Sequence, residues 1–307
     1  MLKRERGKKM FLNGNPVFIE NLRGILKQIY INKNALTGLI ILSAVLAVSV
    51  FAPFLTAHDP WEFGERGEVL KPPDKANFMG TDEVGRDIWT QFIYGGRITL
   101  IVAFIASLIS LTIGTFVGIV FGYFNNFLTA VLSRMTEVFL VLPQLPLMIA
   151  FSILFKPSIT SVILVIGLIS WSSTAKLVGS RVMKVKEYKY IKRLKGMGAG
   201  DFYIICNYII PEILPRIFIS SIFIFSFAVI SESTLSFLGL GDPNYITWGM
   251  MLRYAFSSGA VSIRAYWYII PPGLGITLVS FGFNLLGHSL IGIFNSSLRL
   301  HHLNYRE

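Results

Sequence analysis

Ionisable side chains inside or beside long uncharged runs are the first candidates for chemistry in this sequence. Glu137 and Glu232 border such runs, and His288 lies within one. An ionisable residue in an apolar segment is by default a candidate functional group. Both glutamates lie near the ends of their runs, so water at the headgroup level or an arginine partner explains either one as well as a functional role does. His288 is predicted to be a packing residue, and no chain of ionisable groups indicates a proton relay.

A polar segment from Gly80 to Asp87 has residue types that could hold a metal ion or a phosphate group. Its candidate residues are Gly80, Thr81, Asp82, Gly85, Arg86 and Asp87. The segment lacks the Gly-x-x-x-x-Gly-Lys-Ser/Thr pattern of phosphate loops and the spacing of calcium loops. We therefore predict a structural turn in which Arg86 and Asp87 pair locally.

No other constellation predicts catalysis or a bound cofactor. The sequence has no nucleotide-binding loop, and no Ser-His-Asp or paired-carboxylate set can be assigned to one site. His301 and His302 are adjacent but lack further ligands, which makes a poor metal site. Cys206 is the only cysteine and is predicted to be reduced and to pack. The chain is therefore predicted not to be an enzyme and to bind no metal or cofactor of its own.

Composition places these residues in a membrane protein. Of the 307 residues, 53% are hydrophobic and 15% are charged, and the mean hydropathy is +0.61. Soluble chains are about 25% charged, so this chain has too few charges to cover a soluble surface. The same numbers exclude a disordered chain, and a single cysteine excludes a disulfide scaffold. The net charge of +11 does not indicate nucleic acid, because the basic residues lie between apolar runs.

Six apolar runs could each cross a bilayer, which takes about 20 residues. The fifth is the shortest, but it continues past Glu232. The runs are 36–55, 98–124, 138–155, 157–175, 217–231 and 265–298. We predict an all-α polytopic membrane protein with six transmembrane helices. In the second run Gly114, Gly118 and Gly122 recur at every fourth position, a spacing that lets helices pack closely.

Lysine and arginine determine the orientation, because cytoplasmic loops carry an excess of both. An even number of spans puts both termini on one side of the membrane. That side carries 20 of the 28 basic residues, including eight in the first 35 residues and eight in 176–195. Both termini are therefore predicted to be cytoplasmic.

The runs divide the chain into five parts. Residues 1–35 form a cytoplasmic tail, in which Asn15-Pro16 begins a predicted amphipathic helix on the lipid surface; a plain solvated tail is the alternative. The other parts are a first transmembrane helix at 36–57, an extracytoplasmic loop at 58–97, a core of five spans at 98–298 and a cytoplasmic tail at 299–307.

The cytoplasmic loop between spans four and five, about residues 176–212, is long, basic and patterned like two helices. Tyr190, Leu194 and Met197 recur at helical spacing and form one apolar stripe. Lys192 is among the basic residues on the remaining faces. A short amphipathic helix of this kind is suited to dock in a groove of another protein.

A glycine corner is predicted to join the two helices. Gly198 follows Met197 at the position where a helix can end with a left-handed residue. Asp201 can cap the second helix, which is predicted to stop at Pro211 because proline cannot continue a helix. The sequence therefore predicts a rigid protrusion into the cytosol.

This loop resembles the coupling loop of ABC-importer permeases. The resemblance rests on Tyr190-Ile-Lys-Arg-Leu-Lys-Gly-Met-Gly-Ala-Gly-Asp201 and on Ile209-Ile-Pro-Glu-Ile-Leu-Pro215. Gly198 and Pro211 stand at the spacing of the family pattern. The family's Glu-Ala-Ala signature is absent, because Lys192-Arg193-Leu194 occupies its place.

Three further segments resemble dipeptide and oligopeptide permeases. The first is 80–87, before span two, and the second is Arg134-Met-Thr-Glu137 with Pro143, where the family has Asp in place of Glu137. The third is 232–241, which begins with Glu232. Over about residues 34–299 the chain resembles the second of the two permease subunits, the one with an extended N-terminal tail.

The resemblance implies a subunit of an ATP-driven importer in a prokaryotic cell membrane. It implies a homologous permease around a shared translocation path, two cytoplasmic ATPase subunits on the coupling loops, and an extracytoplasmic binding protein that delivers the substrate. ATP and Mg²⁺ would be bound by the ATPase subunits. Rigid-body motion of those subunits would pass through the coupling loop and alternate the spans between outward and inward openings.

The substrate stays open at this point, because dipeptide, oligopeptide and nickel permeases share these motifs. Peptides are favoured, since the chain is not rich in the His or Cys ligands that suit nickel. A self-sufficient secondary transporter would call for inverted repeats or broken helices with ionisable residues near the midplane. A membrane-embedded enzyme would need clustered His, Asp or Glu within the spans. Both alternatives fit the sequence less well than a transport subunit.

Overall fold

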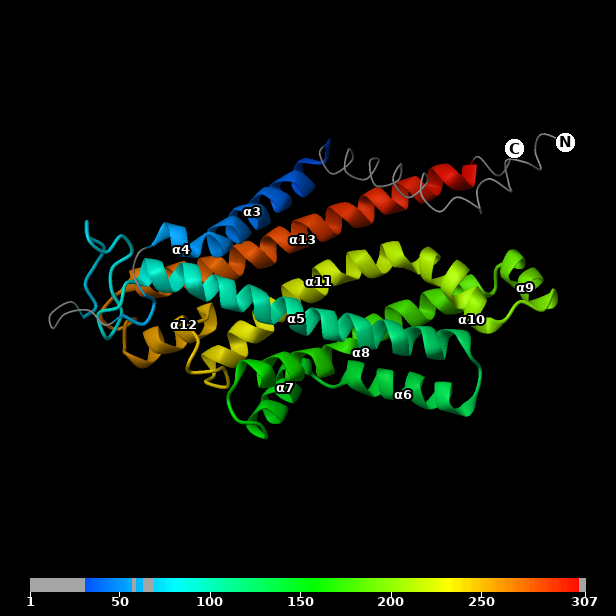
Figure 1. Ribbon diagram of the computed structural model, residues 1–307, viewed down its shortest axis with the longest axis horizontal. Coiled ribbons are helices and arrows are strands. Elements are labelled where there is room, and N and C mark those ends of the chain that lie inside the picture. Colours follow the sequence, from blue (N-terminus) through cyan, green and yellow to red (C-terminus); the bar gives the residue numbers. More distant parts are fainter. Residues whose placement is uncertain (1–30, 57–58, 63–68, 304–307) are drawn as a thin grey trace.

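The computed structural model describes residues 31–56, 59–62 and 69–303. The amphipathic helix predicted to begin at Asn15-Pro16 lies outside these residues. The described residues are helices joined by loops, and the only β-type pairing among them is a single bridge between Thr81 and Asp87. They form an elongated bundle (Figure 1), which confirms the predicted all-α class.

The apolar runs of the sequence all lie in helices of this bundle. Among the described residues, five helical spans are long and apolar enough to cross a membrane, or six if the bent pair α6–α7 counts as one. In chain order the elements are α3 (Lys33–Val50), α4 (Ala52–Leu55), α5 (Ile88–Tyr123), α6 (Phe127–Val141), α7 (Gln144–Ile153), α8 (Ile159–Lys186), α9 (Lys189–Gly196), α10 (Asp201–Ile204), the π-helical turn η1 (Ile205–Ile209), α11 (Ile210–Phe237), α12 (Trp248–Ser257) and α13 (Tyr266–Leu303).

Helix α5 begins at Ile88, well before the apolar run that starts at residue 98. Its first turn is stabilised by Asp87, whose carboxylate accepts a hydrogen bond of 2.8 Å from the backbone N–H of Thr90. A helix of 36 residues is about 54 Å long, whereas the hydrocarbon core is about 30 Å thick. The first turns of α5 therefore extend beyond the bilayer, into the segment predicted to be a loop.

The glycines at every fourth position of α5 let α8 pack against it at short range. A Cβ added at Gly118 would lie 2.8 Å from the carbonyl oxygen of Ala175, and one added at Gly122 would lie 2.7 Å from that of Gly179. A larger residue at these positions would push the two helices apart. The predicted close packing is confirmed, and α8 is the neighbour.

The third apolar run does not form one straight helix, so the prediction of a single continuous span over 138–155 is wrong in this respect. Helices α6 and α7 meet at an angle of 95°. A residue that precedes proline is disfavoured in the helical region, and Leu142, before Pro143, has an extended ψ of 133°. The chain turns there, and α7 packs beside α8.

The predicted stop at Pro211 is also wrong. Helices α10 and α11 and the turn η1 form one continuous helical path from Asp201 to Phe237. Pro211 lies in the first turn of α11, where the missing N–H of proline is tolerated, and a π-helical turn precedes it. The second helix of the predicted protrusion therefore continues directly into the fifth span.

The two ends of the bundle carry different elements. Helices α9 and α10 lie at one end, and the amino end of α3 and the carboxyl end of α13 point toward that end (Figure 1). Helices α4 and α12 and the loop before α5 lie at the other end. Helix α3 packs along α13 through small residues, since a Cβ on Gly38 would lie 2.6 Å from the carbonyl oxygen of Gly282. Most of the candidate residues gather at these two ends.

Candidate functional site

The end formed by residues 189–204, which we call the coupling segment, presents a surface that is both apolar and basic. Met197 and Phe202 are 75% and 81% exposed. Tyr190 and Tyr203 are about half exposed beside them. The exposed basic residues of the segment are Lys189, Lys192, Arg193 and Lys195. Large exposed apolar side chains with basic neighbours mark a surface suited to a protein groove.

A small core of its own fixes the coupling segment to the bundle. Ile191 of α9 is only 2% exposed and belongs to a cluster with Val185 of α8 and Ile204 of α10. Ile209 and Ile213 extend this cluster into η1 and α11 and are fully buried. The segment is therefore seated on α8 and on the path from η1 into α11, and it does not hang as a free loop.

The predicted apolar stripe of α9 divides between two environments. Leu194 is half-buried and packs on the same core as Ile191. Tyr190 and Met197 are exposed on the outer side. Ile191 was missed in the sequence, although it precedes Leu194 by three positions, a helical spacing that places both on one face.

The corner after α9 has the geometry that its sequence predicts. Gly198 has a φ of +84°, and its N–H donates to the carbonyl oxygen of Lys195 at 3.0 Å. The N–H of Ala199 donates to the carbonyl oxygen of Leu194 at 3.1 Å. This pair of hydrogen bonds around a left-handed glycine is the Schellman motif. The predicted left-handed corner is confirmed.

Asp201 does not cap the second helix as predicted. Gly200 is the residue at the cap position, and the Asp201 carboxylate instead accepts a hydrogen bond of 2.6 Å from the Tyr123 hydroxyl. Asp201 also forms an ion pair of 3.2 Å with Lys195. Tyr123 is the last residue of α5. Asp201 therefore joins α10 to both α5 and α9.

Lys192 lies off the apolar stripe, as predicted, and pairs within its own chain. Its Nζ lies 2.5 Å from Oε2 of Glu187, and both side chains are 61% exposed. The hydrogen bond and the positive charge of Lys192 lower the pKa of the Glu187 carboxyl below its ordinary value. Water screens an exposed pair of this kind, so it contributes little to stability.

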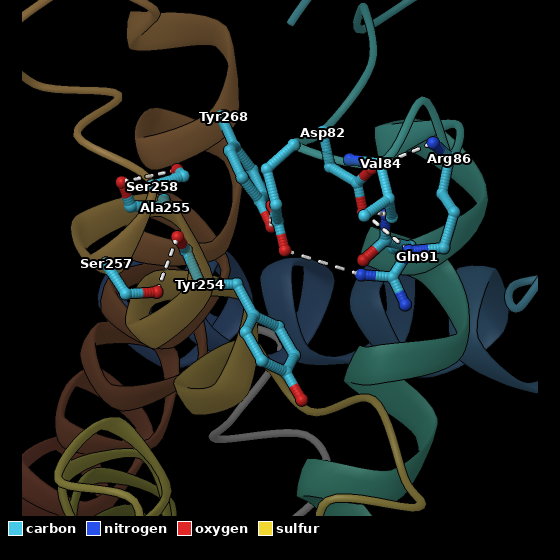
Figure 2. A network of polar contacts seen from close by, with 10 residues as sticks. Asp82, Val84, Arg86, Gln91, Tyr254, Ala255, Ser257, Ser258 and Tyr268 are labelled. Carbon is cyan, nitrogen blue, oxygen red and sulfur yellow. Dashed lines mark hydrogen bonds and ion pairs between the residues drawn. The ribbon is translucent and has the colours of Figure 1, made fainter. Parts of the chain in front are cut away.

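At the opposite end, the segment 80–87 forms a buried polar turn (Figure 2). Asp82 is fully buried and accepts hydrogen bonds from the Arg86 Nε and the Gln91 Nε2, both at 2.7 Å. A structural turn forms as predicted, but the predicted pairing of Arg86 with Asp87 is wrong. Arg86 pairs with Asp82, whereas Asp87 caps the first turn of α5.

This turn is fastened to α12 and α13. The hydroxyl of Tyr268, a buried residue of α13, donates to Oε2 of Glu83 at 2.7 Å. The Arg86 guanidinium lies 5.8 Å from the ring centroid of Tyr254 in α12, within range of a cation–π contact. Gly80 and Gly85 have φ values of +74° and +81°, which the turn requires and glycine adopts freely.

Glu137 has the arginine partner that the sequence left as one of two alternatives. Its Oε2 lies 2.8 Å from NH1 of Arg134, and its Oε1 lies 3.0 Å from Nζ of Lys176. The group joins α6 to α8. These contacts explain Glu137 without any role in proton transfer.

Neither of the two alternatives holds for Glu232. The side chain is only 1% exposed, so water at the headgroup level does not surround it. None of the ion pairs found among the described residues includes Glu232. Its carboxyl oxygens instead accept hydrogen bonds from the hydroxyls of Ser236 at 2.8 Å and Ser233 at 3.3 Å.

The structure thus brings most of the candidate residues into two groups. Tyr190, Lys192, Leu194, Met197, Gly198 and Asp201 lie together in the coupling segment, and Pro211 follows in α11. Residues 80–87 lie at the other end, and Arg134 and Glu137 lie on α6. Ile191, Tyr123 and Tyr268 were not among the residues predicted from the sequence. Of these, only Ile191 carried a local signal, because the partners of Tyr123 and Tyr268 are far away in the sequence.

Comparison with known proteins gives two matching family models. The model described as binding-protein-dependent transport system inner membrane component matches residues 114–300. The model described as N-terminal transmembrane domain of oligopeptide transport permease C matches residues 22–73. Together they cover most of the chain.

Relatives of known name match over most of their length. The dipeptide transport system permease protein DppC of Alkalihalophilus pseudofirmus is 33% identical over 269 residues, which is 87% of each chain. The oligopeptide transport system permease protein OppC of Bacillus subtilis is 27% identical over 270 residues, also 87% of each chain. Among solved structures, a chain of the MetNI methionine ABC transporter in an inward facing conformation has a TM-score of 0.52 and 16% identity. The match covers 65% of this chain and 96% of that one, and it shows a shared fold.

Proposed function

The chain belongs to the family of binding-protein-dependent transport system inner membrane components, and from this membership we propose that it is the permease subunit of an ATP-driven importer of di- or oligopeptides. Relatives that cover most of the chain are named for dipeptides and oligopeptides, which favours peptides over nickel chelates. As a multi-pass protein of the bacterial inner membrane, it works with a second permease, ATPase subunits and a binding protein.

The observation that carries the mechanism is the construction of the coupling segment. Its outer side exposes Met197 and Phe202, while its inner side buries Ile191 in a core shared with α8 and α11. Helix α10 continues through η1 into α11 without a break. A docked ATPase that moves the outer side therefore moves the spans as well, because a continuous helical path joins the two.

Polar contacts join α5, α8 and α11 at the end of the bundle that carries the coupling segment. Asp201 holds the last residue of α5 through the Tyr123 hydroxyl. Lys186 of α8 donates to the carbonyl oxygen of Tyr123 at 2.8 Å, and Arg181 of α8 pairs with Glu212 of α11 at 2.9 Å. These contacts favour rigid-body motion of α5, α8 and α11 during alternating access.

The end that carries the coupling segment is assigned to the cytoplasm, together with both termini. The excess of lysine and arginine on that side supports this orientation. ATP and Mg²⁺ are assigned to the partner ATPase subunits. Hydrolysis there supplies the differential free energy between outward and inward states, which a docking contact alone cannot supply.

Transport in proteoliposomes tests the proposed function. The chain, its partner permease, the ATPases and the binding protein are reconstituted together, and uptake of a radiolabelled dipeptide is measured with and without ATP inside the vesicles. We expect uptake that depends on ATP and on the binding protein. Uptake of a nickel chelate without peptide uptake would contradict the substrate class, and uptake without the ATPases would indicate a secondary transporter.

A matched pair of variants tests the docking surface separately. Phe202→Glu adds a charge to an 81% exposed residue of the coupling segment, and Phe78→Glu makes the same change at a 73% exposed residue of the opposite end. We expect the first variant to lose the ATPase subunits during purification and the second to keep them. Retention of the ATPases by both variants would remove Phe202 from the docking surface.

A further inference from the structure

Glu232 lies where three helices meet. It belongs to α11 and is 1% exposed. Two of its hydrogen-bond donors, Ser233 and Ser236, come from α11 itself. The hydroxyls of Thr99 in α5 and of Thr247, the residue that caps α12, also lie beside its carboxyl group. One carboxyl group therefore contacts α5, α11 and the start of α12.

The first turn of α12 is packed tightly into this junction. A Cβ on Gly249 would lie 2.4 Å from the carbonyl oxygen of Ser233, so only glycine allows α12 to approach α11 so closely. The backbone N–H of Trp248 donates to the Thr99 hydroxyl at 3.2 Å, and its indole N–H donates to the carbonyl oxygen of Phe92 at 2.9 Å. Helix α12 is thus held by α5 on one side and α11 on the other.

The environment of Glu232 argues against a role in binding substrate or relaying protons. A substrate group cannot reach a side chain that is 1% exposed. A relay needs further ionisable groups, whereas the groups that hydrogen-bond Glu232 are hydroxyls of Ser and Thr. A carboxyl group buried without a cationic partner is costly unless its hydrogen bonds are made, so its geometry is fixed by the hydroxyls that surround it.

We propose that Glu232 is a positioning residue of the transport cycle, which locks the first turn of α12 onto α5 and α11 so that the three move as one body. This role of Glu232 rests on the proposed function only where peptide transport is the quantity measured. In this arrangement a movement of α5 and α11, which both reach the coupling segment, is conveyed to α12 at the far end of the bundle. Loss of the carboxyl group frees α12 from that movement.

A removable covalent link between α5 and the start of α12 tests this proposal. A Cβ on Gly95 would lie 3.5 Å from Cγ2 of Ile246, so Gly95→Cys with Ile246→Cys, in a Cys206→Ser background, is the cysteine pair chosen for this link. The pair is combined with Glu232 or with Glu232→Leu, which keeps the bulk but removes the acceptors. The complete transporter is assayed in proteoliposomes after reduction and after oxidation, and disulfide formation is measured on gels.

We expect reduced Glu232→Leu to transport the labelled dipeptide about tenfold more slowly, the ratio that corresponds to one buried hydrogen-bonding group left without its partner. Oxidation should restore transport by Glu232→Leu to about the rate of the oxidised cysteine variant that retains Glu232. The disulfide then holds the start of α12 on α5 in place of the carboxyl group. Glu232→Gln, which keeps one acceptor oxygen, should stay close to the wild type. A side chain needed for ligand binding or proton transfer would not be replaced by a disulfide.

Two results would overturn the proposal: full activity of reduced Glu232→Leu, or an inactive Glu232→Leu transporter in which the disulfide has formed. If Glu232→Leu does not assemble, Thr99→Val takes its place in the same comparison. It removes the α5 hydroxyl that lies beside Glu232 and accepts from the backbone N–H of Trp248, and the same slowing and rescue are expected. The rate of disulfide formation needs no substrate and should be faster with Glu232 than with leucine. It therefore tests the lock even if the wild type transports no peptide, a result that would contradict the proposed function alone.

Discussion

Replacement of Gly198 tests whether the corner of the coupling segment is needed in its left-handed form. Its φ is +84°, a conformation in which a Cβ costs about 1–2 kcal/mol. A Cβ at this position would meet no atom within 4 Å, so strain is the whole cost and no clash adds to it. Gly198→Ala should therefore shift the equilibrium between the closed and open corner by roughly 5- to 30-fold toward the open form.

Hydrogen exchange measures this equilibrium directly. The N–H groups of Gly198 and Ala199 donate to carbonyl oxygens of α9 and are protected only while the corner is closed. Mass spectrometry of the peptide that contains them should show protection reduced by roughly 5- to 30-fold in Gly198→Ala. Asparagine visits the left-handed region more readily than alanine, so Gly198→Asn should lie between the wild type and Gly198→Ala.

The functional consequence is weaker coupling to the ATPase subunits. Gly198→Ala should lower dipeptide transport and transport-coupled ATP hydrolysis while membrane insertion stays normal, and Gly198→Val should lower them at least as much. The matched control is Gly200→Ala, because Gly200 lies in the same corner with a φ of −66° and has no atom within 4 Å of an added Cβ. Equal protection and equal transport in Gly198→Ala and Gly200→Ala would refute the argument from strain.

Three further predictions concern topology, helix packing and the contact at the end of α5. In a cysteine-free background, Ser158→Cys should react with an impermeant reagent added to intact cells and Lys189→Cys should not, because basic segments stay in the cytoplasm; labelling of the second from outside would reverse the orientation. Gly118→Val should lower the Tm of the purified chain through about 1–3 kcal/mol of overpacking against α8, whereas Gly273→Ala, which meets no atom within 4 Å and places a better helix former in α13, should not lower the Tm. Tyr123→Phe removes a hydrogen bond to a carboxylate worth about 1.5–3 kcal/mol and should reduce the number of peptides transported per ATP while assembly persists; an unchanged ratio would show that this contact does not transmit motion.

The features that the sequence predicts correctly depend on residues close to one another in the chain. The spans follow from hydropathy summed over about 20 neighbouring residues. The glycine spacing of α5 requires only the positions of Gly114, Gly118 and Gly122. The left-handed corner at Gly198 requires only the end of α9, because both hydrogen bonds of the Schellman motif are made within six residues.

Hydropathy does not detect the break between α6 and α7, although the sequence carries a local cue for it. A bend changes the direction of the chain and not its composition, so the run 138–155 scores as one span. The local cue was Pro143, since the residue before a proline is disfavoured in the helical region. Proline alone does not locate a break, however, because α13 continues through Pro271 and Pro272 and α11 continues through Pro215.

Other features depend on contacts between distant parts of the chain. Asp201 is a good cap by residue type, but the hydroxyl of Tyr123 reaches it from α5 and gives it a stronger role. Glu232 borders an apolar run and was therefore expected beside headgroup-level water or an arginine partner. It is buried because α12 turns back across the carboxyl end of α11 and the amino-terminal half of α5, and nothing local predicts that turn.

Lys192 occupies the place of a glutamate in the family's signature, which reverses one charge on the coupling segment. Glu187 lies 2.5 Å from it in the same chain, so the pair is neutral as a unit and a docked partner would meet little of the charge of Lys192. Salt screens what is left beyond about 8 Å. The apolar side chains Met197 and Phe202 are insensitive to the sign of that charge, because the free energy of their burial depends on area. In the proposed function, the coupling segment therefore docks on the ATPase through Met197 and Phe202. Docking does not require the glutamate that the family has in place of Lys192.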